Sequence, residues 1–475
     1  MNVTAVNNGA NASSMSATTV LKVFPKPRVS AVKPKIGPLR GGNIITIYGS
    51  HFGSKYSRGF DSRIYEDISV FVEGSKCMNT SFISDDELSC TTPAGAGKSV
   101  VSVNISDGQL TRSGHLEDGY VHSLVYAGGS LSNPSSSGFV AYSPRVVGDN
   151  HPSLGAFDLV ASKSVRALKI FQGILYVGGD FVGLGVDDTR FVLAWDGLKI
   201  AKLEGGVDGS VLCLLDFQNR LVVAGAFTHV LKHSGSVRTG CLTLWDGQQW
   251  TETALGAVVD GAVTALATNG TVLYVAGRFK NIGSLQADGM AMWNGSVWLS
   301  LQDVQFSGDI TALAASSSLL YVAGKFRAPT NENDESSRVL LWEGKTAHWT
   351  SLGDIQGRVN SLLAIAEYLY VGGDFTMAGY VPVANLAVFH GSRWETVAEG
   401  LNGAVHALLH SNACLYIGGE FTAVYQAAPT GKEEVPAMFS ARYCKASGQE
   451  RRIEGLEPFP GMGFVYALTP ATSQT

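Results

Sequence analysis

The chain has 475 residues, of which 45% are apolar, 16% are charged and 56 are glycine, and its formal net charge is −5. This length predicts more than one hydrophobic core, and a glycine-rich chain with few charges favours short strands joined by tight turns over long helices. The sequence has neither a concentrated run of Lys and Arg nor an apolar stretch of roughly 20 residues. We therefore expect an all-β protein that does not bind nucleic acid and has no membrane span in this sequence.

Residues 1–27 are predicted to be a linker or the end of a preceding domain. NVTAVNNGANASS (2–14) parallels VNISDGQLTRSG (103–114) of the domain that follows. The segment lacks the basic start and apolar run of a secretory signal, so we expect any export signal to lie upstream. In an exported chain, the Asn-x-Ser/Thr sequons are glycosylation candidates: Asn2, Asn11, Asn79, Asn104, Asn269 and Asn294.

Residues 28–127 are predicted to form a small β-sandwich. Short alternating segments with Gly-rich turns indicate its strands: PLRGGNIITIYGSHFG (38–53), VFVEG (70–74) and VVSVNISDGQ (100–109). The stretch from Gly37 to Gly53 resembles the signature of the IPT/TIG immunoglobulin-like domain, as does the later stretch from Cys90 to Gly97. The resemblance implies an immunoglobulin-like fold. Cys77 and Cys90 bracket a predicted strand-loop-strand, so they are disulfide candidates, with buried free thiols as the alternative.

Residues 128–475 contain a repeated motif. LYVGGDF occurs at 175–181 and again at 369–375, with weaker copies at 221–227, 273–279, 320–326 and 415–421. A V-x-A-L-like strand precedes each copy, and the starts of these strands are 46, 52, 47, 49 and 46 residues apart. A strand ending in an aromatic residue follows each copy. This period and the number of strands per unit are typical of a β-propeller blade.

Glycine and tryptophan recur at fixed places in the repeat. We expect the glycines to remove side chains where a strand approaches a neighbour closely, and the tryptophans to fill such spaces. The repeated positions are Gly179, Gly225, Gly277, Gly324, Gly373, Gly419, Trp195, Trp245, Trp293 and Trp342. Cys414 and Cys444 fall on elements that are predicted neighbours and form a second disulfide candidate.

The two ends of the repeat region are predicted to close the propeller. After the sixth copy comes another V-x-A-L-like strand, FVYAL (464–468), and GFVAYSP (138–144) resembles the aromatic-ended strand. A blade shared by both ends gives seven blades and removes exposed sheet edges. From 138 to 468 the repeats resemble those of the fungal cortical polarity-marker family, which are large cell-surface proteins. The resemblance implies adhesion, signalling or wall-associated roles.

One variable position in the repeat is a candidate for binding. The residue after the glycines changes from copy to copy within a constant frame, so it is expected to line a channel or rim: Asp180, Arg278, Lys325, Asp374 and Glu420. We expect no catalytic residues, no cofactor and no metal, with zinc at His229 and His233 as the alternative. Variable segments at 182–190, 228–240, 280–289, 327–337 and 422–436 are expected to form a recognition face.

The sequence therefore predicts an immunoglobulin-like IPT/TIG sandwich followed by a seven-bladed propeller. The expected function is non-enzymatic binding or adhesion outside the cell or on its surface, toward a protein or glycan ligand. The sandwich would serve as a spacer or second contact. The alternative is a carbohydrate-active enzyme that uses channel carboxylates, with Asp180, Asp374 and Glu420 as the candidates.

Overall fold

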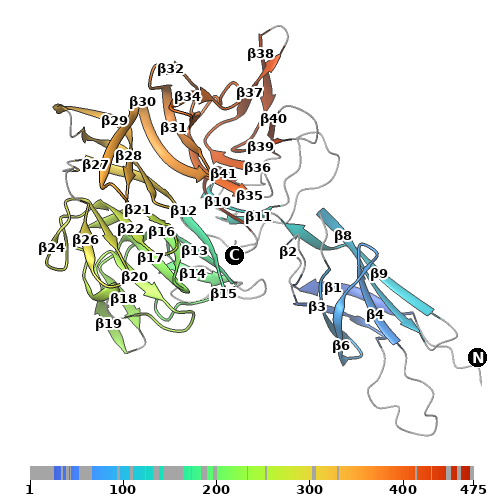
Figure 1. Ribbon diagram of the computed structural model, residues 1–475. Coiled ribbons are helices and arrows are strands. Elements are labelled where there is room, and N and C mark those ends of the chain that lie inside the picture. The colour runs from blue at the N-terminus through green and yellow to red at the C-terminus, as the bar shows by residue number, and fades with distance from the viewer. Residues whose placement is uncertain are drawn as a thin grey trace, which may run out of the picture. The chain divides into compact units, whose positions relative to one another are not determined.

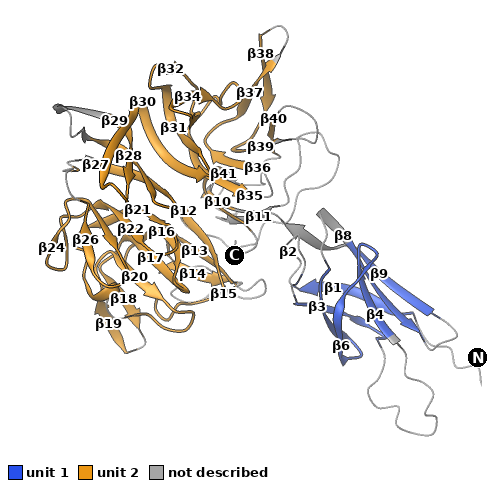
Figure 2. Ribbon diagram, in the orientation of Figure 1, with its two compact units in different colours: residues 1–35, 40–121 blue, residues 36–39, 122–475 orange. Residues whose placement is uncertain are grey.

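A computed structural model shows a chain built from strands (Figure 1). The structure describes residues 26–33, 36–38, 42, 44–52, 67–93, 97–106, 111–123, 125–131, 139–142, 164–172, 174–182, 190–195, 200–232, 234–251, 254–301, 306, 308–328, 331–411, 414–428, 431–445, 451–456 and 462–470. The contacts divide the chain into unit 1, residues 1–35 and 40–121, and unit 2, residues 36–39 and 122–475 (Figure 2). Among the described residues, no helix has the length and apolar character of a membrane span.

Unit 1 has two antiparallel sheets that share one core. The first sheet has the order β1 (Arg28–Lys33), β3 (Ile44–Ser50), β7 (Glu87–Thr91), β6 (Met78–Ser84). The second contains β9 (Thr111–Ser123), β8 (Gly97–Ser106), β4 (Asp67–Val72) and β5 (Ser75–Lys76). Ile45 and Leu88 of the first sheet are fully buried, as are Val70 and Val103 of the second, and all four belong to one apolar cluster. Alternation along the strands thus brings one face of each sheet into the core.

The first three repeats of unit 2 form three separate sheets. Their strand orders are β12 (Val165–Phe171), β13 (Ile174–Val182), β14 (Arg190–Trp195), β15 (Ile200–Ala201); β16 (Ser210–Phe217), β17 (Arg220–Ala226), β20 (Leu242–Trp245); and β21 (Ala262–Thr268), β22 (Leu273–Arg278), β25 (Met290–Trp293), β26 (Trp298–Ser300). In each, the V-x-A-L-like strand is first and the repeated glycine motif is second. The short turn Ala254–Gly256 is a 3-10 element.

The next two repeats share one long strand. Their sheet has the order β27 (Gly308–Ser316), β28 (Leu319–Ala328), β29 (Asn331–Glu343), β30 (His348–Ile365), β31 (Tyr368–Ala378), β33 (Leu386–His390), β34 (Arg393–Thr396). Residues 348–354 of β30 pair with β29, whereas residues 355–365 pair with β31. The second half of β30 is therefore the first strand of the fifth repeat.

Two further sheets complete unit 2. The sixth repeat forms β35 (Val405–Ser411), β36 (Cys414–Gly419), β39 (Ser440–Lys445), β40 (Arg451–Gly455). The last sheet has the order β11 (Phe139–Tyr142), β10 (Val125–Leu131), β41 (Met462–Pro470). Short hairpins accompany the sheets: β18 (His229–Lys232) with β19 (Gly235–Arg238), β23 (Asn281–Ile282) with β24 (Leu285–Gln286), β31 with β32 (Val381–Pro382), and β37 (Ala423–Ala428) with β38 (Gly431–Pro436). One more strand in the described part of the chain is β2 (Ile36–Pro38).

The repeated glycines lie at a bulge between the first and second strands. The ladder shifts by one residue there, for example between Val165 and Ala167 and between Val359 and Ser361. A Cβ atom at the second glycine would lie 2.0–2.3 Å from a carbonyl oxygen of the first strand, a distance that no side chain tolerates. This close approach explains the glycines at Gly179, Gly225, Gly277, Gly324, Gly373 and Gly419.

The first glycine of a pair packs against the next sheet. A Cβ at Gly178 would lie 2.5 Å from Cγ1 of Val211, and the equivalent valine for Gly372 is Val405. The expectation that the tryptophans fill these spaces is therefore wrong. Trp195 is the last residue of β14 and pairs with Leu175, whereas Gly178 pairs with Val192. The tryptophan and the glycines therefore lie at opposite ends of this ladder.

Three of the four tryptophans instead pair with a second tryptophan that follows five to seven residues later in the chain. Trp245 lies 5.0 Å from Trp250 between ring centroids, and Trp293 lies 5.5 Å from Trp298. Trp342 lies 6.4 Å from Trp349. Trp195, Trp245 and Trp342 are buried, and Trp293 is half-buried. These aromatic pairs contribute packing in their own three repeats.

The sheet built from both ends of unit 2 differs in detail from the prediction. Residues 464–468 lie in the same sheet as residues 139–142, but β10 stands between them and pairs with both β11 and β41 (Figure 1). Strand β10, VYAGGSL, is a weak copy of the repeat motif, and the predicted boundary between residues 127 and 128 divided it. Unit 2 accordingly includes Val125–Ala127, although the predicted sandwich extended to residue 127.

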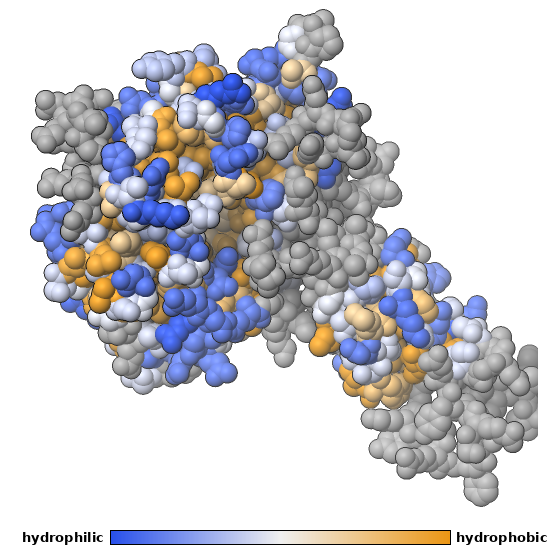
Figure 3. Space-filling model, viewed as in Figure 1, coloured by the Kyte–Doolittle hydropathy of each residue, from blue (hydrophilic) through white to orange (hydrophobic). Residues whose placement is uncertain are grey.

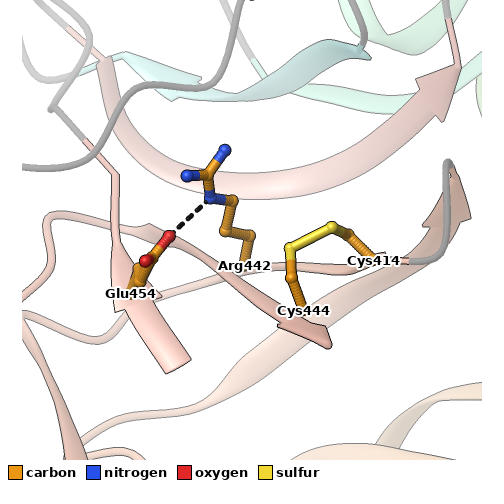
Figure 4. Close-up of a disulfide and its surroundings, with 4 residues drawn as sticks. All are labelled: Cys414, Arg442, Cys444 and Glu454. Carbon is orange, nitrogen blue, oxygen red and sulfur yellow. Dashed lines mark hydrogen bonds and ion pairs between the residues drawn. A yellow bond between two sulfur atoms is a disulfide. The ribbon is translucent and has the colours of Figure 1, made fainter. Parts of the chain in front are cut away.

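Four of the six cysteines lie in two pairs. Cys414 and Cys444 stand opposite each other on β36 and β39 and form a disulfide, next to the ion pair of Arg442 with Glu454 at 2.7 Å (Figure 4). Cys77 and Cys90 are buried free thiols, so the structure has the alternative to their predicted disulfide. A hydrogen bond with Cys77 raises the pKa of Cys90, and burial raises it further. The two thiols are thus neighbours in the core of unit 1.

Candidate functional site

The predicted channel or rim residues lie at one end of the hairpins formed by first and second strands. Asp180 is half-buried, and the other four are exposed. Each of the five residues faces the start of the first strand of its repeat. Arg278, Lys325 and Asp374 stand opposite Ala262, Asp309 and Arg358 in the ladder. The backbone amides of Asp180 and Glu420 donate to the carbonyls of Ser164 and Ala404, which directly precede their strands. The structure therefore places all five positions at equivalent points of their sheets.

Tyr466 connects two of these residues across three sheets. Arg166 Nε donates to Asp180 Oδ2 at 3.0 Å, and the Arg166 guanidinium lies 4.9 Å from the centroid of the Tyr466 ring. On the other side, the rings of Tyr466 and His406 are 4.9 Å apart, and His406 Nε2 lies 2.9 Å from Glu420 Oε1. The Tyr466 hydroxyl also donates to Glu420 Oε1 at 3.5 Å. We call these five residues the Tyr466 cluster.

A second charged group lies at the same end of other sheets. Arg278 donates to both carboxylate oxygens of Asp309, at 2.6 and 2.5 Å. The hydrogen bond from Arg278 lowers the pKa of Asp309, and slight burial opposes this effect while the charges of Arg278 and Arg358 add to it. Asp309 thus stays ionised between two basic side chains.

The balance of charge at this end suits a polar ligand without strong charge. Among the Tyr466 cluster, the residues after the glycines and their ladder partners, four side chains are basic (Arg166, Arg278, Lys325 and Arg358), four are acidic (Asp180, Asp309, Asp374 and Glu420) and one is the imidazole of His406. Such a set offers both donors and acceptors, and it lacks the concentrated positive charge that a phosphate backbone requires.

The described contacts commit the Asp180 carboxylate to Arg166 and the Glu420 carboxylate to His406. Each of the two carboxylates therefore already has a neighbouring basic side chain as its partner.

Sequence reasoning missed Arg166, His406 and Tyr466. All three occupy the x position of the V-x-A-L-like strand, between two buried residues. Strand alternation therefore directs them away from the packed faces, toward the residues that follow the glycines. The same alternation was available in the sequence and would have identified this position in each repeat.

An acidic or amide residue before the first strand anchors each of three hairpins. Asp208 accepts hydrogen bonds from the backbone amides of Thr228 and His229 at 2.7 and 2.9 Å and from the Thr228 hydroxyl at 2.7 Å. Partial burial raises the pKa of Asp208, but these hydrogen bonds outweigh burial and lower it to about 2. Asp260 and Asn402 accept equivalent backbone hydrogen bonds in their own sheets. These residues therefore hold the start of the variable hairpins.

The predicted glycosylation residues differ in accessibility. Asn79 and Asn294 are exposed, whereas Asn104 and Asn269 are half-buried. Asn269 Nδ2, the atom that would carry a glycan, donates to the carbonyl of Ser317 at 2.7 Å. Asn2 and Asn11 lie outside the described residues.

The zinc alternative gains no support from the described geometry. His229 Nδ1 lies 3.0 Å from Asp208 Oδ2, and His233 lies outside the described residues. Within the described ranges, no group of at least three His, Cys, Asp or Glu side chains could hold a metal ion.

Comparison with known proteins assigns one part of the chain to a family. Residues 27–117 match the model of the IPT/TIG domain. This segment is an IPT/TIG domain. The two sheets of unit 1 and their shared core around Ile45 and Ile47 are what such an immunoglobulin-like domain requires. No curated protein sequence matches the chain.

Solved structures resemble the chain only distantly. The chain is 12% identical to an auxiliary nutrient binding protein from Bacteroides thetaiotaomicron, with 92% of this chain and 91% of that chain covered and a TM-score of 0.33. It is 13% identical to Sqt1 of Saccharomyces cerevisiae, with 76% and 91% covered and a TM-score of 0.35. Scores of this size establish neither a shared fold nor a shared function. The likeness of the repeats to the fungal cortical polarity-marker family stays a prediction.

Proposed function

We propose that unit 2 is a seven-bladed β-propeller and that the protein is a non-enzymatic binding or adhesion protein, located outside the cell or on its surface. Support for the ring comes from the first strands, which contact one another in the series β12, β16, β21, β27, β30, β35, β41, with β41 returning to β12. The glycine–valine contacts follow the same series, including Gly418 with Val465 and Gly128 with Val165. In a ring of this kind every sheet is covered by two neighbours.

The observation that carries the binding proposal is the common position of the variable hairpins. The hairpins β18–β19, β23–β24 and β37–β38 fall in predicted variable segments, and the structure adds β31–β32, which the sequence analysis did not include. Each comes at the end of the repeat motif, so the four hairpins leave their sheets at the same end. The Tyr466 cluster and the charged group around Asp309 lie at that end. Tyr380, in the turn between β31 and β32, is 100% exposed. Exposed aromatic residues on hairpins are typical anchors for a protein or glycan ligand.

The surface of unit 2 offers the mixed chemistry that such recognition needs. Hydrophilic and apolar residues are interspersed over the face seen in Figure 3. The IPT/TIG domain would serve as a spacer or as a second contact. The alternative function is a carbohydrate-active enzyme, but the ion pairs of Asp180 and Glu420 favour binding.

A binding screen with the full chain tests this proposal. The chain would be applied to a glycan array and to intact cells, together with Tyr380→Ala. Val297→Ala is the matched control, because Val297 is 53% exposed in a turn at the opposite end of the strands. We expect Tyr380→Ala to weaken binding and Val297→Ala to leave it unchanged.

Two results would contradict the proposal. Binding that depends on the IPT/TIG domain and is indifferent to Tyr380 would overturn the recognition face. Hydrolysis of an arrayed glycan that Glu420→Gln abolishes would favour the enzyme instead.

A further inference from the structure

A cavity lies between the fifth and sixth repeats of unit 2, away from the variable hairpins. Its volume is about 200 Å³. It is lined chiefly by Ile365, Tyr368, Tyr370, His410, Leu415 and Tyr443. Ile365 and Tyr368 flank the turn between β30 and β31, whereas the β31–β32 hairpin with Tyr380 extends from the other end of β31. The cavity is therefore at the opposite end of the strands from the proposed recognition face.

Among the described residues, the lining is aromatic and polar and includes no carboxylate, ammonium or guanidinium group. Three phenol hydroxyls and one imidazole can donate or accept hydrogen bonds, and Ile365 and Leu415 add apolar surface. A cation would enter this space without a carboxylate in the described lining, and an anion would meet the His410 imidazole but no Lys or Arg side chain, which is costly in a partly enclosed site. A ligand that suits the lining is neutral, has an apolar face for the aromatic rings and has several hydroxyl groups.

Neighbouring contacts hold the cavity walls in place. The ring of Tyr368 stacks on His390 with centroids 4.2 Å apart and planes 15° from parallel. On the other wall, Tyr443 stands opposite Leu415 in the ladder, and the adjacent pair is the Cys414–Cys444 disulfide. Tyr368, His410 and Tyr443 are half-buried, so they reach solvent as well as the core. A pre-organised wall reduces the entropy lost when a ligand binds.

We propose that this cavity binds a single neutral sugar ring. Stacking on tyrosine would accommodate the apolar face of the ring, and the hydroxyls and imidazole would bind its hydroxyl groups. The volume has room for several water molecules and hence for one small ring, but not for a long chain. This site is distinct from the proposed recognition face and does not depend on it.

Titration of the full chain with free sugars tests the proposal. The probes are glucose, galactose, mannose and N-acetylglucosamine, and binding is measured by saturation-transfer NMR and calorimetry. We expect at least one sugar to bind, and Tyr368→Ala to weaken its affinity roughly tenfold or more. Tyr443→Phe keeps the ring and removes one hydroxyl, so a loss of roughly three- to tenfold is expected. Tyr48→Phe, on β3 of unit 1, is the matched control for Tyr443→Phe and should leave the sugar affinity unchanged.

The outcomes separate this proposal from the proposed function. If Tyr368→Ala fails to fold, as near-ultraviolet circular dichroism would show, Tyr443→Phe alone carries the test. Absence of binding by all four sugars overturns the sugar site, as does binding that Tyr443→Phe leaves unchanged. Binding of tetramethylammonium with no binding of sugars would also overturn it. Loss of cell or array binding in Tyr380→Ala with unchanged sugar titration would support both proposals.

Discussion

Replacing the second glycine of a repeat by alanine is expected to destabilise unit 2 much more than replacing the first. A Cβ at Gly373 would lie 2.0 Å from the carbonyl oxygen of Arg358. Ordinary carbon–oxygen contacts are about 3.3 Å, so β30 and β31 would have to separate by about 1.3 Å at the bulge. That separation disrupts the ladder hydrogen bonds on both sides, each of which contributes about 1 kcal/mol. We expect Gly373→Ala to lower the free energy of unfolding by at least about 3 kcal/mol.

The first glycine provides a matched control. A Cβ at Gly372 would lie 2.5 Å from Cγ1 of Val405, which is a side-chain atom that can move. Alanine already occupies the equivalent position in three other repeats, where Ala224, Ala276 and Ala323 are fully buried. Overpacking of this kind costs about 1–3 kcal/mol, and we expect Gly372→Ala near the lower end.

Urea unfolding followed by tryptophan fluorescence would compare the two variants with the native chain. The midpoint should fall much further for Gly373→Ala than for Gly372→Ala. Equal shifts, or a larger shift for Gly372→Ala, would refute the steric argument, because both changes add the same methyl group.

Three further predictions concern other parts of the chain. Hydrogen bonds lower the pKa of Asp208 to about 2, so the ionised carboxylate stabilises the fold above about pH 4. This stabilisation is lost as the pH falls from about 4 to about 2. In an acid titration followed by circular dichroism, Asp208→Asn should therefore lose less stability over this range than the native chain. Cys77 and Cys90 should be recovered as free thiols, whereas Cys414 and Cys444 should be bridged, and mass spectrometry of unreduced, denatured peptides that finds a Cys77–Cys90 disulfide would contradict this. When the chain is secreted from a glycosylating host, glycopeptide analysis should find Asn294 occupied and Asn269 empty, and the reverse occupancy would contradict the hydrogen-bond argument.

The strands and their glycines were predictable because the signals for them are local. Alternation of buried residues has a period of two, and the repeat motif marks each second strand with the glycines that its bulge requires. The IPT/TIG signature likewise lies within one short stretch. The residues that follow the glycines could also be identified, since their chemistry varies within a constant frame.

Only the tertiary structure decided which residues meet across sheets. Arg166 and Tyr466 are far apart in the chain, and they meet because β12 and β41 are neighbours. Val211 of the next sheet packs beside Gly178. The sequence of a single repeat does not show which residue of a neighbouring sheet packs there, so tryptophan was predicted instead. Strand β10 was missed because its motif is weak and only its pairing with β41 reveals its role. Contacts within a hairpin are set by nearby residues, whereas contacts between sheets depend on the order in which the sheets pack, which the local sequence does not encode.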